Sequence, residues 1–325
     1  MSEIKINYPE LPEKKRWLVT GAAGFIGSHL TEVLLSNGQN VVGLDDFSTG
    51  KIKNIEEALK NSQGRGNFTL IKGSITDIKT CREAAEGVDY VLHHAALASV
   101  PASMKDPVNY NEVNVSGFMN ILQASRENKI KRVVYASSSA VYGDDDAPQK
   151  IESSIGKFLS PYAMTKYINE INAEFFTRVY GLECVGLRYF NVFGKRQDPN
   201  GAYAAVIPKW ISAIKNNELP IIYGDGTATR DFCAVQNVVN ANLLSALEPE
   251  AAGKVFNIGC GVSTSLNDLM NVIYEVAAPG REIKFERKPP RDGDIIHSSA
   301  SIEKAKEILK YTPILFLKEG LKFLV

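Results

Sequence analysis

Residues 16–30 read RWLVTGAAGFIGSHL, and this stretch decides the expected fold. Its apolar first part, residues 16–20, suits a buried strand and runs directly into Gly21, Gly24 and Gly27, where a helical pattern begins. A turn this tight needs glycine dihedrals, and the backbone N–H groups at the start of such a helix can bind a pyrophosphate. Because strand, glycines and helix occur in the required order, we expect a dinucleotide site here rather than a plain turn.

A carboxylate follows at the position that such a site needs. The next apolar segment, residues 40–45, ends in Asp45, 24 residues after Gly21. A carboxylate at that strand end can accept hydrogen bonds from both hydroxyls of an adenosine ribose, and it would repel a 2′-phosphate. We therefore expect NAD in preference to NADP. The simpler alternative is a structural turn followed by a solvated pair of aspartates.

The alternation of short apolar segments and longer helical patterns continues through the first half of the chain. Strands are expected at residues 16–20, 40–45, 68–72, 90–94, 132–137 and 182–189, with helical patterns at 26–37, 78–86 and 108–128 between them. Near-continuous apolar strands that alternate with helices predict the α/β class and a doubly wound parallel sheet, the Rossmann arrangement.

The pattern changes from about Asn191, where loops rich in Gly, Pro and Asn separate shorter elements. One more apolar segment, at 254–258, is expected to rejoin the first sheet. We therefore expect an NAD-binding domain at 1–191 plus 234–258, and a smaller, discontinuous nucleotide-sugar-binding domain at 192–233 plus 259–325. Ligands of such folds bind outside the carboxyl ends of the strands, and the second domain would close over that crevice.

Composition narrows the classes of partner. The 325 residues carry 37 Lys and Arg against 37 Asp and Glu, so neither a nucleic acid nor a membrane surface is an expected partner. The four cysteines lie far apart, which favours reduced thiols over disulfides or a zinc site, and no metal site is expected. The N-terminal segment is charged and lacks an apolar signal core, and no apolar run has membrane-spanning length. A cytoplasmic protein is expected.

Tyr162 and Lys166 stand four residues apart in the segment SPYAMTKY, which has the form of a helix entered at Ser160. At this spacing both side chains share one helix face, and a neighbouring ammonium lowers the pKa of a tyrosine, which makes Tyr162 a candidate base near neutral pH. Alone, such a pair is more often a packed Tyr beside an exposed Lys. The dinucleotide pattern and the serine turn ASSSAVYG at 136–143 favour a reactive pair.

Four segments, TGAAGFIGSHL, ASSSAVYG, SPYAMTKY and LRYFNVFGKRQDP, together resemble the extended short-chain dehydrogenase/reductase family. Within it the chain is similar to the nucleotide-sugar 4-epimerases, from about residue 15 to residue 324. The stretch GLRYFNVFGKRQDPNGAYAAVIPKW is especially close to the subgroup that epimerises UDP-N-acetylhexosamines at C4. The resemblance implies reversible epimerisation of UDP-N-acetylglucosamine and UDP-N-acetylgalactosamine through a 4-keto sugar, with NAD as a bound cofactor.

The resemblance also implies roles for the residues of the serine turn and the helix. Tyr162 removes the proton of the sugar 4-hydroxyl while C4 gives hydride to NAD, and Lys166 bonds the nicotinamide ribose. Ser138 bonds the oxygen that becomes the ketone, and Ser139 is a second hydroxyl. Related 4,6-dehydratases carry an Asp-Glu pair after the turn's Ser or Thr, and related decarboxylases usually carry a Glu at the second place. Ser139 and Ala140 stand there in this chain, so oxidation without elimination is expected.

The remaining site residues are implied in the same way. Those for the cofactor are Gly21, Gly24, Phe25, Ile26, Gly27, Asp45, Ser74, Ile75, Ala95, Asn114, Lys166 and Tyr189. Those for the substrate are Ser99, Ser138, Tyr162, Asn191, Val206, Tyr223, Arg230, Arg291, Asp294 and Ser298. Both arginines match positions that contact the diphosphate. Ser298 takes the place of a bulky Tyr found in epimerases restricted to galactose and glucose, so N-acetylated sugars are expected substrates.

Other hypotheses stay open at this point. A UDP-glucose 4-epimerase is the first alternative, and a dehydratase or decarboxylase of the same family is disfavoured by the turn without carboxylates. A non-catalytic dinucleotide-binding protein typically loses the Tyr or the Lys, whereas Tyr162, Lys166 and Ser138 are all present. The resemblance further implies a homodimer that packs the helix at 108–128 and the Tyr162 helix against a partner.

Overall fold

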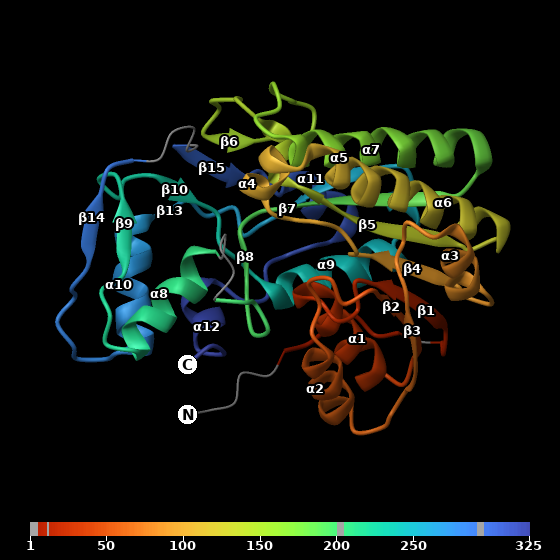
Figure 1. Ribbon diagram of the computed structural model, residues 1–325, viewed down its shortest axis with the longest axis horizontal. Helices are drawn as coiled ribbons and strands as arrows, with labels where there is room; N and C mark the ends of the chain where they lie inside the picture. The colour runs from red at the N-terminus through yellow and green to blue at the C-terminus, as the bar shows by residue number, and fades with distance from the viewer. Residues whose placement is uncertain (1–5, 12, 200–204, 291–295) are drawn as a thin grey trace.

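A parallel sheet forms the centre of the molecule, seen in a computed structural model that describes residues 6–11, 13–199, 205–290 and 296–325 (Figure 1). Its strand order in the described chain is β12-β7-β5-β4-β1-β2-β3, and every neighbouring pair is parallel. The strands are β1 (Arg16–Thr20), β2 (Asn40–Asp45), β3 (Asn67–Lys72), β4 (Tyr90–His93), β5 (Arg132–Ser138), β7 (Glu183–Tyr189) and β12 (Val255–Ile258). The doubly wound parallel sheet is confirmed, and so is the return of residues 254–258 to it.

Helices cover both faces of this sheet (Figure 1). On one face, α3 (Ile78–Ala85), α6 (Gly117–Glu127) and α7 (Pro161–Tyr180) pack against the strands through an apolar cluster that includes Phe118 and Phe176. On the other face, α1 (Phe25–Ser36) and α9 (Val235–Leu247) do so through a cluster that includes Leu30 and Val239. Helix α2 (Ile52–Ser62) packs on α1.

The expected single helix at 108–128 is wrong in detail. The segment consists of α5 (Pro107–Asn111), a π-helical turn η1 (Glu112–Ser116) and α6, after a short α4 (Val100–Lys105). Asn114 lies buried within the π turn, and its side chain bonds both backbone groups of Leu97 at 2.8 and 3.0 Å. A π turn widens a helix by one residue and often marks a functional site. Here it accompanies a polar side chain that holds the loop after β4.

The second lobe lies beyond the carboxyl ends of the sheet strands, at the left of Figure 1. Its core includes Trp210, Ile214 and Ile273. Its helices are α8 (Val206–Lys215), α10 (Leu266–Ala277) and α12 (Leu317–Leu321), and β9 (Ile221–Tyr223) pairs with β14 (Glu286–Lys288). The remaining short elements of the described chain, in both lobes, are η2 (Ser139–Tyr142), β6 (Gln149–Lys150), β8 (Val192–Phe193), β10 (Thr229–Arg230), β11 (Cys233–Ala234), η3 (Pro249–Ala251), β13 (Thr264–Ser265), β15 (His297–Ala300) and α11 (Glu303–Leu309).

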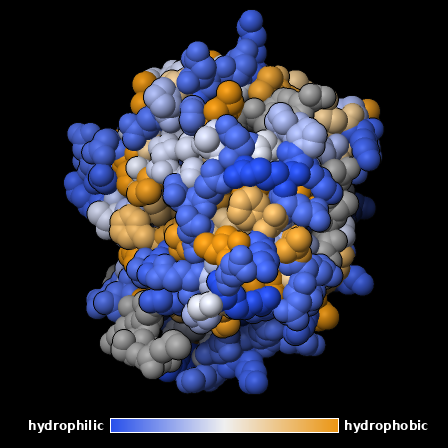
Figure 2. Space-filling model, turned by 90° about the vertical axis from the view of Figure 1, so that its left-hand side faces the viewer, coloured by the Kyte–Doolittle hydropathy of each residue, from blue (hydrophilic) through white to orange (hydrophobic). Residues whose placement is uncertain are grey.

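The surface of the second lobe is largely hydrophilic. Figure 2 looks onto this end of the molecule, where hydrophilic atoms predominate and hydrophobic ones gather mainly across the middle of the view. All four cysteines are free thiols and buried, as expected from their spacing. Among the described helices, none combines the length and the apolar character that crossing a membrane requires.

Candidate active site

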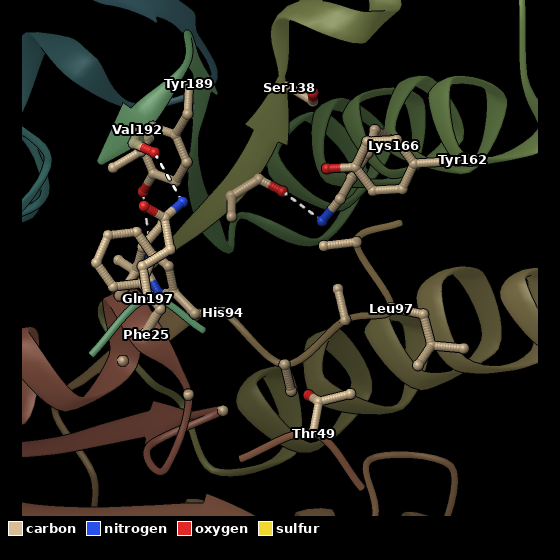
Figure 3. Close-up of a pocket in the computed structure, with 18 of the residues that line it drawn as sticks. Phe25, Thr49, His94, Leu97, Ser138, Tyr162, Lys166, Tyr189, Val192 and Gln197 are labelled. Carbon is tan, nitrogen blue, oxygen red and sulfur yellow. Dashed lines mark hydrogen bonds between the residues drawn. The ribbon is translucent and has the colours of Figure 1, made fainter. Parts of the chain in front are cut away.

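A cavity of about 660 Å³ opens where the central strands end, in the expected crevice (Figure 3). Its walls come from the glycine loop after β1, the ends of β2 and β4, the serine turn after β5, the start of α7 and the loops after β7 and β8. In the sheet order these segments are neighbours, so residues far apart in sequence meet at one edge. The cavity is the candidate active site.

The glycine loop leaves room for a ligand at the start of α1. A Cβ at Gly27 would lie 2.0 Å from the Gly21 carbonyl oxygen, and Gly21 has a φ of 69° with a would-be Cβ 2.8 Å from the Ala95 nitrogen. No side chain caps the first turn of α1. Its backbone N–H groups are therefore available to an anion such as a diphosphate. Gly21, Gly24, Phe25, Ile26 and Gly27 all line the cavity, where they were expected.

Asp45 lies at the end of β2, where a ribose would be held. Its Oδ2 accepts from the Ala23 N–H and its Oδ1 from the Phe47 N–H, each at 2.8 Å. Burial raises the pKa of this carboxyl above its usual range, while the two backbone hydrogen bonds act in the opposite direction. The backbone therefore fixes the orientation of Asp45, which lines the cavity.

The other expected cofactor residues divide into two groups. Ile75, Ala95 and Tyr189 line the cavity. Ser74 does not: its hydroxyl bonds that of Thr76 at 2.9 Å. Asn114 does not line the cavity either. It holds Leu97, which does. Asn114 is thus a supporting residue in this structure.

Tyr162, Lys166 and Ser138 come together on one side of the cavity (Figure 3). Ser160 caps α7 by accepting from the Ala163 N–H at 3.2 Å, which sets where the helix begins. Lys166 Nζ lies 5.8 Å from the centre of the Tyr162 ring and donates to the Ala136 carbonyl oxygen at 2.9 Å. The Ser138 hydroxyl accepts from the Ala140 N–H at 3.1 Å, and Ser138, Ser139 and Ala140 line the same wall as Tyr162.

The expected effect of Lys166 on Tyr162 is wrong for the protein chain by itself. Burial raises the pKa of Tyr162 above its usual range, and the nearby Ser138 hydroxyl only opposes this. Burial also lowers the pKa of Lys166 to about 8. The reason is that protein atoms surround much of both side chains, and removal from water disfavours the charged form of both groups. Tyr162 is therefore a protonated phenol here, placed to exchange its proton with a bound hydroxyl or carbonyl.

His94 and Tyr189 form a further pair in the cavity wall (Figure 3). His94 Nε2 lies 2.9 Å from the Tyr189 hydroxyl, which also accepts from Asn242 Nδ2 at 2.8 Å. Burial lowers the pKa of His94 to about 3, so its ring is neutral. The pair fixes the Tyr189 ring at the end of β7.

A second cavity, of about 490 Å³, adjoins the first in the second lobe. Val206 and Tyr223 line it, as do the aromatic rings of Trp210 and Phe232. The two cavities share Asn191, Val192 and Arg230. Expected substrate residues therefore lie in both.

The other expected substrate residues differ in where they lie. Ser298 lines the first cavity. Ser99 does not, because its hydroxyl caps α4 by accepting from the Ala102 N–H at 3.2 Å. Arg291 and Asp294 lie outside the described residues.

Several cavity residues were not predicted from the sequence. Arg196, Gln197 and Asp198 line the first cavity from the loop after β8, and Ser48, Thr49, Lys51 and Asn54 line it from the region after β2. The motif KRQDP was available as a signal. Nothing in its local pattern says that it folds back over α1.

Comparisons with known proteins identify the family of the chain. A family model described as the NAD dependent epimerase/dehydratase family matches residues 17–259. A UDP-glucose 4-epimerase of Mycolicibacterium smegmatis is 38% identical over 308 residues, which cover 94% of this chain and 96% of that protein.

Two solved structures extend the comparison. A UDP-N-acetylglucosamine 4-epimerase from Methanobrevibacter ruminantium M1, in complex with UDP-N-acetylmuramic acid, has a TM-score of 0.88 and 39% identity, covering 96% of this chain and 98% of that one. A UDP-glucose 4-epimerase from Thermus thermophilus, in complex with NAD, has a TM-score of 0.83 and 31% identity, covering 95% of this chain and 97% of that one.

Proposed function

The chain belongs to the NAD dependent epimerase/dehydratase family and uses NAD, and we propose that it interconverts UDP-N-acetylglucosamine and UDP-N-acetylgalactosamine by epimerisation at C4. One observation carries the proposal. Tyr162, Lys166 and Ser138 meet in the cavity, beside a turn whose next two residues, Ser139 and Ala140, carry no carboxyl group.

The residues of the site support a reversible oxidation of a sugar carbon. When bound, NAD accepts a hydride from C4 and later returns it to the opposite face of the sugar. The chain alone keeps Tyr162 protonated, so the positive charge of bound NAD, added to that of the Lys166 ammonium, would have to favour the phenolate. That phenolate would take the proton of the 4-hydroxyl as the C4–H bond breaks, and it would give the proton back as the hydroxyl forms again. Ser138, which lines the cavity beside Tyr162, would hold the same oxygen. Lys166 holds its ammonium beside the Tyr162 ring.

The distribution of acidic groups disfavours elimination or loss of a carboxylate as the main reaction. The acidic residues that line the cavity, among those described, are Asp45, Asp46 and Asp198. Asp45 and Asp46 lie at the end of β2, which β4 and β1 separate from the serine turn after β5. Asp198 pairs with Lys51 on that same side. A group able to protonate or deprotonate C5 or C6 is thus lacking beside Ser138 in the described part of the site.

The second cavity supports a nucleoside diphosphate as the carrier of the sugar. Tyr223, Trp210 and Phe232 offer aromatic surface to a base, and Arg230 lies where the two cavities meet. A guanidinium at this junction suits a diphosphate that links base and sugar. Ser298 presents a small side chain to the first cavity, which leaves space for an N-acetyl group.

Helix α7 supports a homodimer as part of the proposal. Met164, Ile171, Phe175 and Val179 are exposed along one side of it, with Ile171 at 52% exposure. Val108 in α5, a neighbour of α7, is 76% exposed. An apolar stripe of this kind on two adjacent helices suits a second copy of the chain. Analytical ultracentrifugation should give twice the chain mass, and Ile171→Glu should shift the protein to monomer.

Product analysis tests the proposed reaction. The purified protein is incubated separately with UDP-N-acetylglucosamine and UDP-glucose, and the 4-epimers are separated by chromatography. We expect turnover of the N-acetylated substrate at a rate at least equal to that of UDP-glucose. A steep preference for UDP-glucose would instead establish the second candidate, a UDP-glucose 4-epimerase, which the relative from M. smegmatis favours.

A tyrosine variant tests the catalytic assignment. Tyr162→Phe should lower kcat by about a hundredfold or more, since it removes the group that carries the proton, and it should leave NAD bound. Tyr180→Phe, at the far end of α7, is the matched control and should keep full activity. Unchanged activity in Tyr162→Phe would refute the assignment.

A further inference from the structure

The loop after β8 reaches from the second lobe back to the helices that flank the cofactor cavity. We name residues 194–198, GKRQD, the strap. His29 Nε2 in α1 lies 3.0 Å from the Lys195 carbonyl oxygen, and Asp198 accepts from Lys51 Nζ at 2.7 Å. Arg196 pairs with Glu32 of α1 and Glu57 of α2. The strap is therefore fastened at three points.

The strap also forms part of the cavity wall, through Arg196, Gln197 and Asp198. It lies directly on the start of α1. A Cβ at Gly194 would come within 3.1 Å of the Phe25 ring and 2.5 Å of Val235. The first turn of α1, which offers its N–H groups to a diphosphate, thus has the strap against it.

Arg196 is incompletely paired although its side chain is only 5% exposed. Nη2 donates to Glu32, and Nε donates to Glu57 Oε2 at 3.3 Å. Nη1 is buried and has no partner among the described residues. A buried charged donor without an acceptor is costly, and native proteins seldom keep one unless a bound water, ion or ligand completes it. Its backbone has a φ of 65°, a conformation that side chains other than glycine rarely adopt.

Gln197 also has an unpaired buried atom, which is a hydrogen-bond acceptor and not a donor. Its Nε2 donates to the Val192 carbonyl oxygen at 3.1 Å, while its Oε1 is buried without a partner in the described chain. Gln197 lines the same cavity as Phe25, His94 and Tyr189, all of which Figure 3 labels. Arg196 and Gln197 both line the cavity, and each has one buried side-chain atom, a donor in the first and an acceptor in the second, without a partner in the described chain.

We propose that the strap retains the dinucleotide through the catalytic cycle, with Arg196 donating from Nη1 to its diphosphate and Gln197 accepting from one of its hydroxyl or amide groups. The inference rests on NAD binding and not on which sugar is epimerised. Retention has a clear use in such a reaction. A hydride taken from the sugar has to be returned to the same sugar, so the cofactor must not leave between the two steps.

The test measures binding, in the full-length protein freed of cofactor. NAD affinity is determined by titration calorimetry, and the dissociation rate by displacement of bound NADH fluorescence. Arg196→Met should weaken NAD binding about ten- to hundredfold, the usual effect of losing a charge-assisted hydrogen bond, mostly through faster dissociation. Arg178→Met removes an exposed arginine paired with Glu174 on α7 and should change both quantities less than twofold.

A second background separates a direct contact from charge repulsion, because Arg196→Met also removes the guanidinium that pairs with Glu32 and Glu57. In a Glu32→Gln/Glu57→Gln protein, adding Arg196→Met should still weaken NAD binding at least tenfold. If the loss disappears in that background, the guanidinium only neutralises the two glutamates, and the proposed diphosphate contact is wrong. An affinity and dissociation rate within twofold of the parent in Arg196→Met itself would overturn the whole proposal. Should Arg196→Met fail to fold, Arg196→Gln is used with the same criteria.

Discussion

Two buried arginines eight residues apart make different use of their charge. Arg188, in β7, and Arg196, in the strap, are 4% and 5% exposed at the side chain. Every nitrogen of Arg188 has a partner: Nε and Nη2 donate to Glu170 at 2.9 and 2.7 Å, and Nη1 donates to the Tyr142 hydroxyl and the Glu152 carbonyl oxygen, each at 3.0 Å. Arg196 leaves Nη1 without a partner in the described chain.

The surroundings explain the difference. Glu170 lies one helical turn after Lys166 and accepts from Ser137, the residue before Ser138, at 2.5 Å. Tyr142 ends the serine turn and donates to Asn257 in β12 at 2.6 Å. Arg188 therefore links the serine turn to α7, and its hydrogen bonds are complete without a ligand. Arg196 lines the cavity, and a ligand there would complete its hydrogen bonds. The complete pairing of Arg188 suits a structural role, whereas the unpaired Nη1 of a residue that lines the cavity supports the binding role proposed for Arg196.

The largest expected effect is on folding and comes from Arg188. Arg188→Met leaves the Glu170 carboxylate buried without its partner, which typically costs about 3–5 kcal/mol. Urea unfolding of the cofactor-free protein measures the loss. Glu170→Gln/Arg188→Met should recover part of it, because the stranded charge is gone. A loss below about 1 kcal/mol in the single variant would mean that the pair does not hold this region together.

Lys166 is a third buried cation, and it sharpens the comparison because its hydrogen-bond partner is a carbonyl oxygen and not a carboxylate. Burial lowers its pKa to about 8 from the 10.5 of an exposed lysine. Between these values the unfolded chain holds a proton that the folded protein has released, so this group makes folding more favourable as the pH rises from 8 towards 10.5. The gain is about 3 kcal/mol over the whole interval. The difference in unfolding free energy between the parent and Lys166→Met should therefore vary with pH across this window. A difference in unfolding free energy that stays constant across this pH window would mean that Lys166 does not titrate within it.

Arg196 should behave in the opposite way to Arg188. Glu32 and Glu57 are 24% and 45% exposed, so water can reach them when Arg196→Met removes their partner, and the cofactor-free protein should lose less stability than Arg188→Met. What should be lost is stabilisation by NAD. A ten- to hundredfold weaker affinity removes about 1.4–2.7 kcal/mol at saturating cofactor. Thermal unfolding with and without NAD measures this. An equal loss in both conditions would make Arg196 a structural residue like Arg188.

The two arginines also show what the sequence can and cannot reveal. The sheet was predictable to within a residue at most strand ends, because buried parallel strands are continuous apolar runs. The glycine loop after the first of these runs indicated which type of parallel sheet they form. The Tyr162 helix was predictable for a similar reason: Ser160 and Pro161 give a strong local start signal.

What failed depends on contacts between distant segments. Arg196 meets Glu32 and Glu57 across 164 and 139 residues, and no periodic pattern relates them. The π turn at 112–116 accompanies the bond between Asn114 and Leu97, which a helical pattern does not reveal. The direction in which the pKa of Tyr162 shifts depends on how far folding buries its side chain. The sequence shows only that a lysine lies one helical turn away.

The smallest expected effect concerns the third fastening of the strap. Lys51 and Asp198 are 57% and 45% exposed, and an ion pair in water contributes about 0–1 kcal/mol. Lys51→Met should therefore change the unfolding free energy by less than about 1 kcal/mol and the NAD affinity by less than about twofold. Lys53→Met, two residues on and 79% exposed, is the matched control. If Lys51→Met released NAD as readily as Arg196→Met, retention would depend on closing the strap at its surface rather than on the buried guanidinium. That result would also make retention sensitive to salt, because exposed pairs are screened and buried ones much less so.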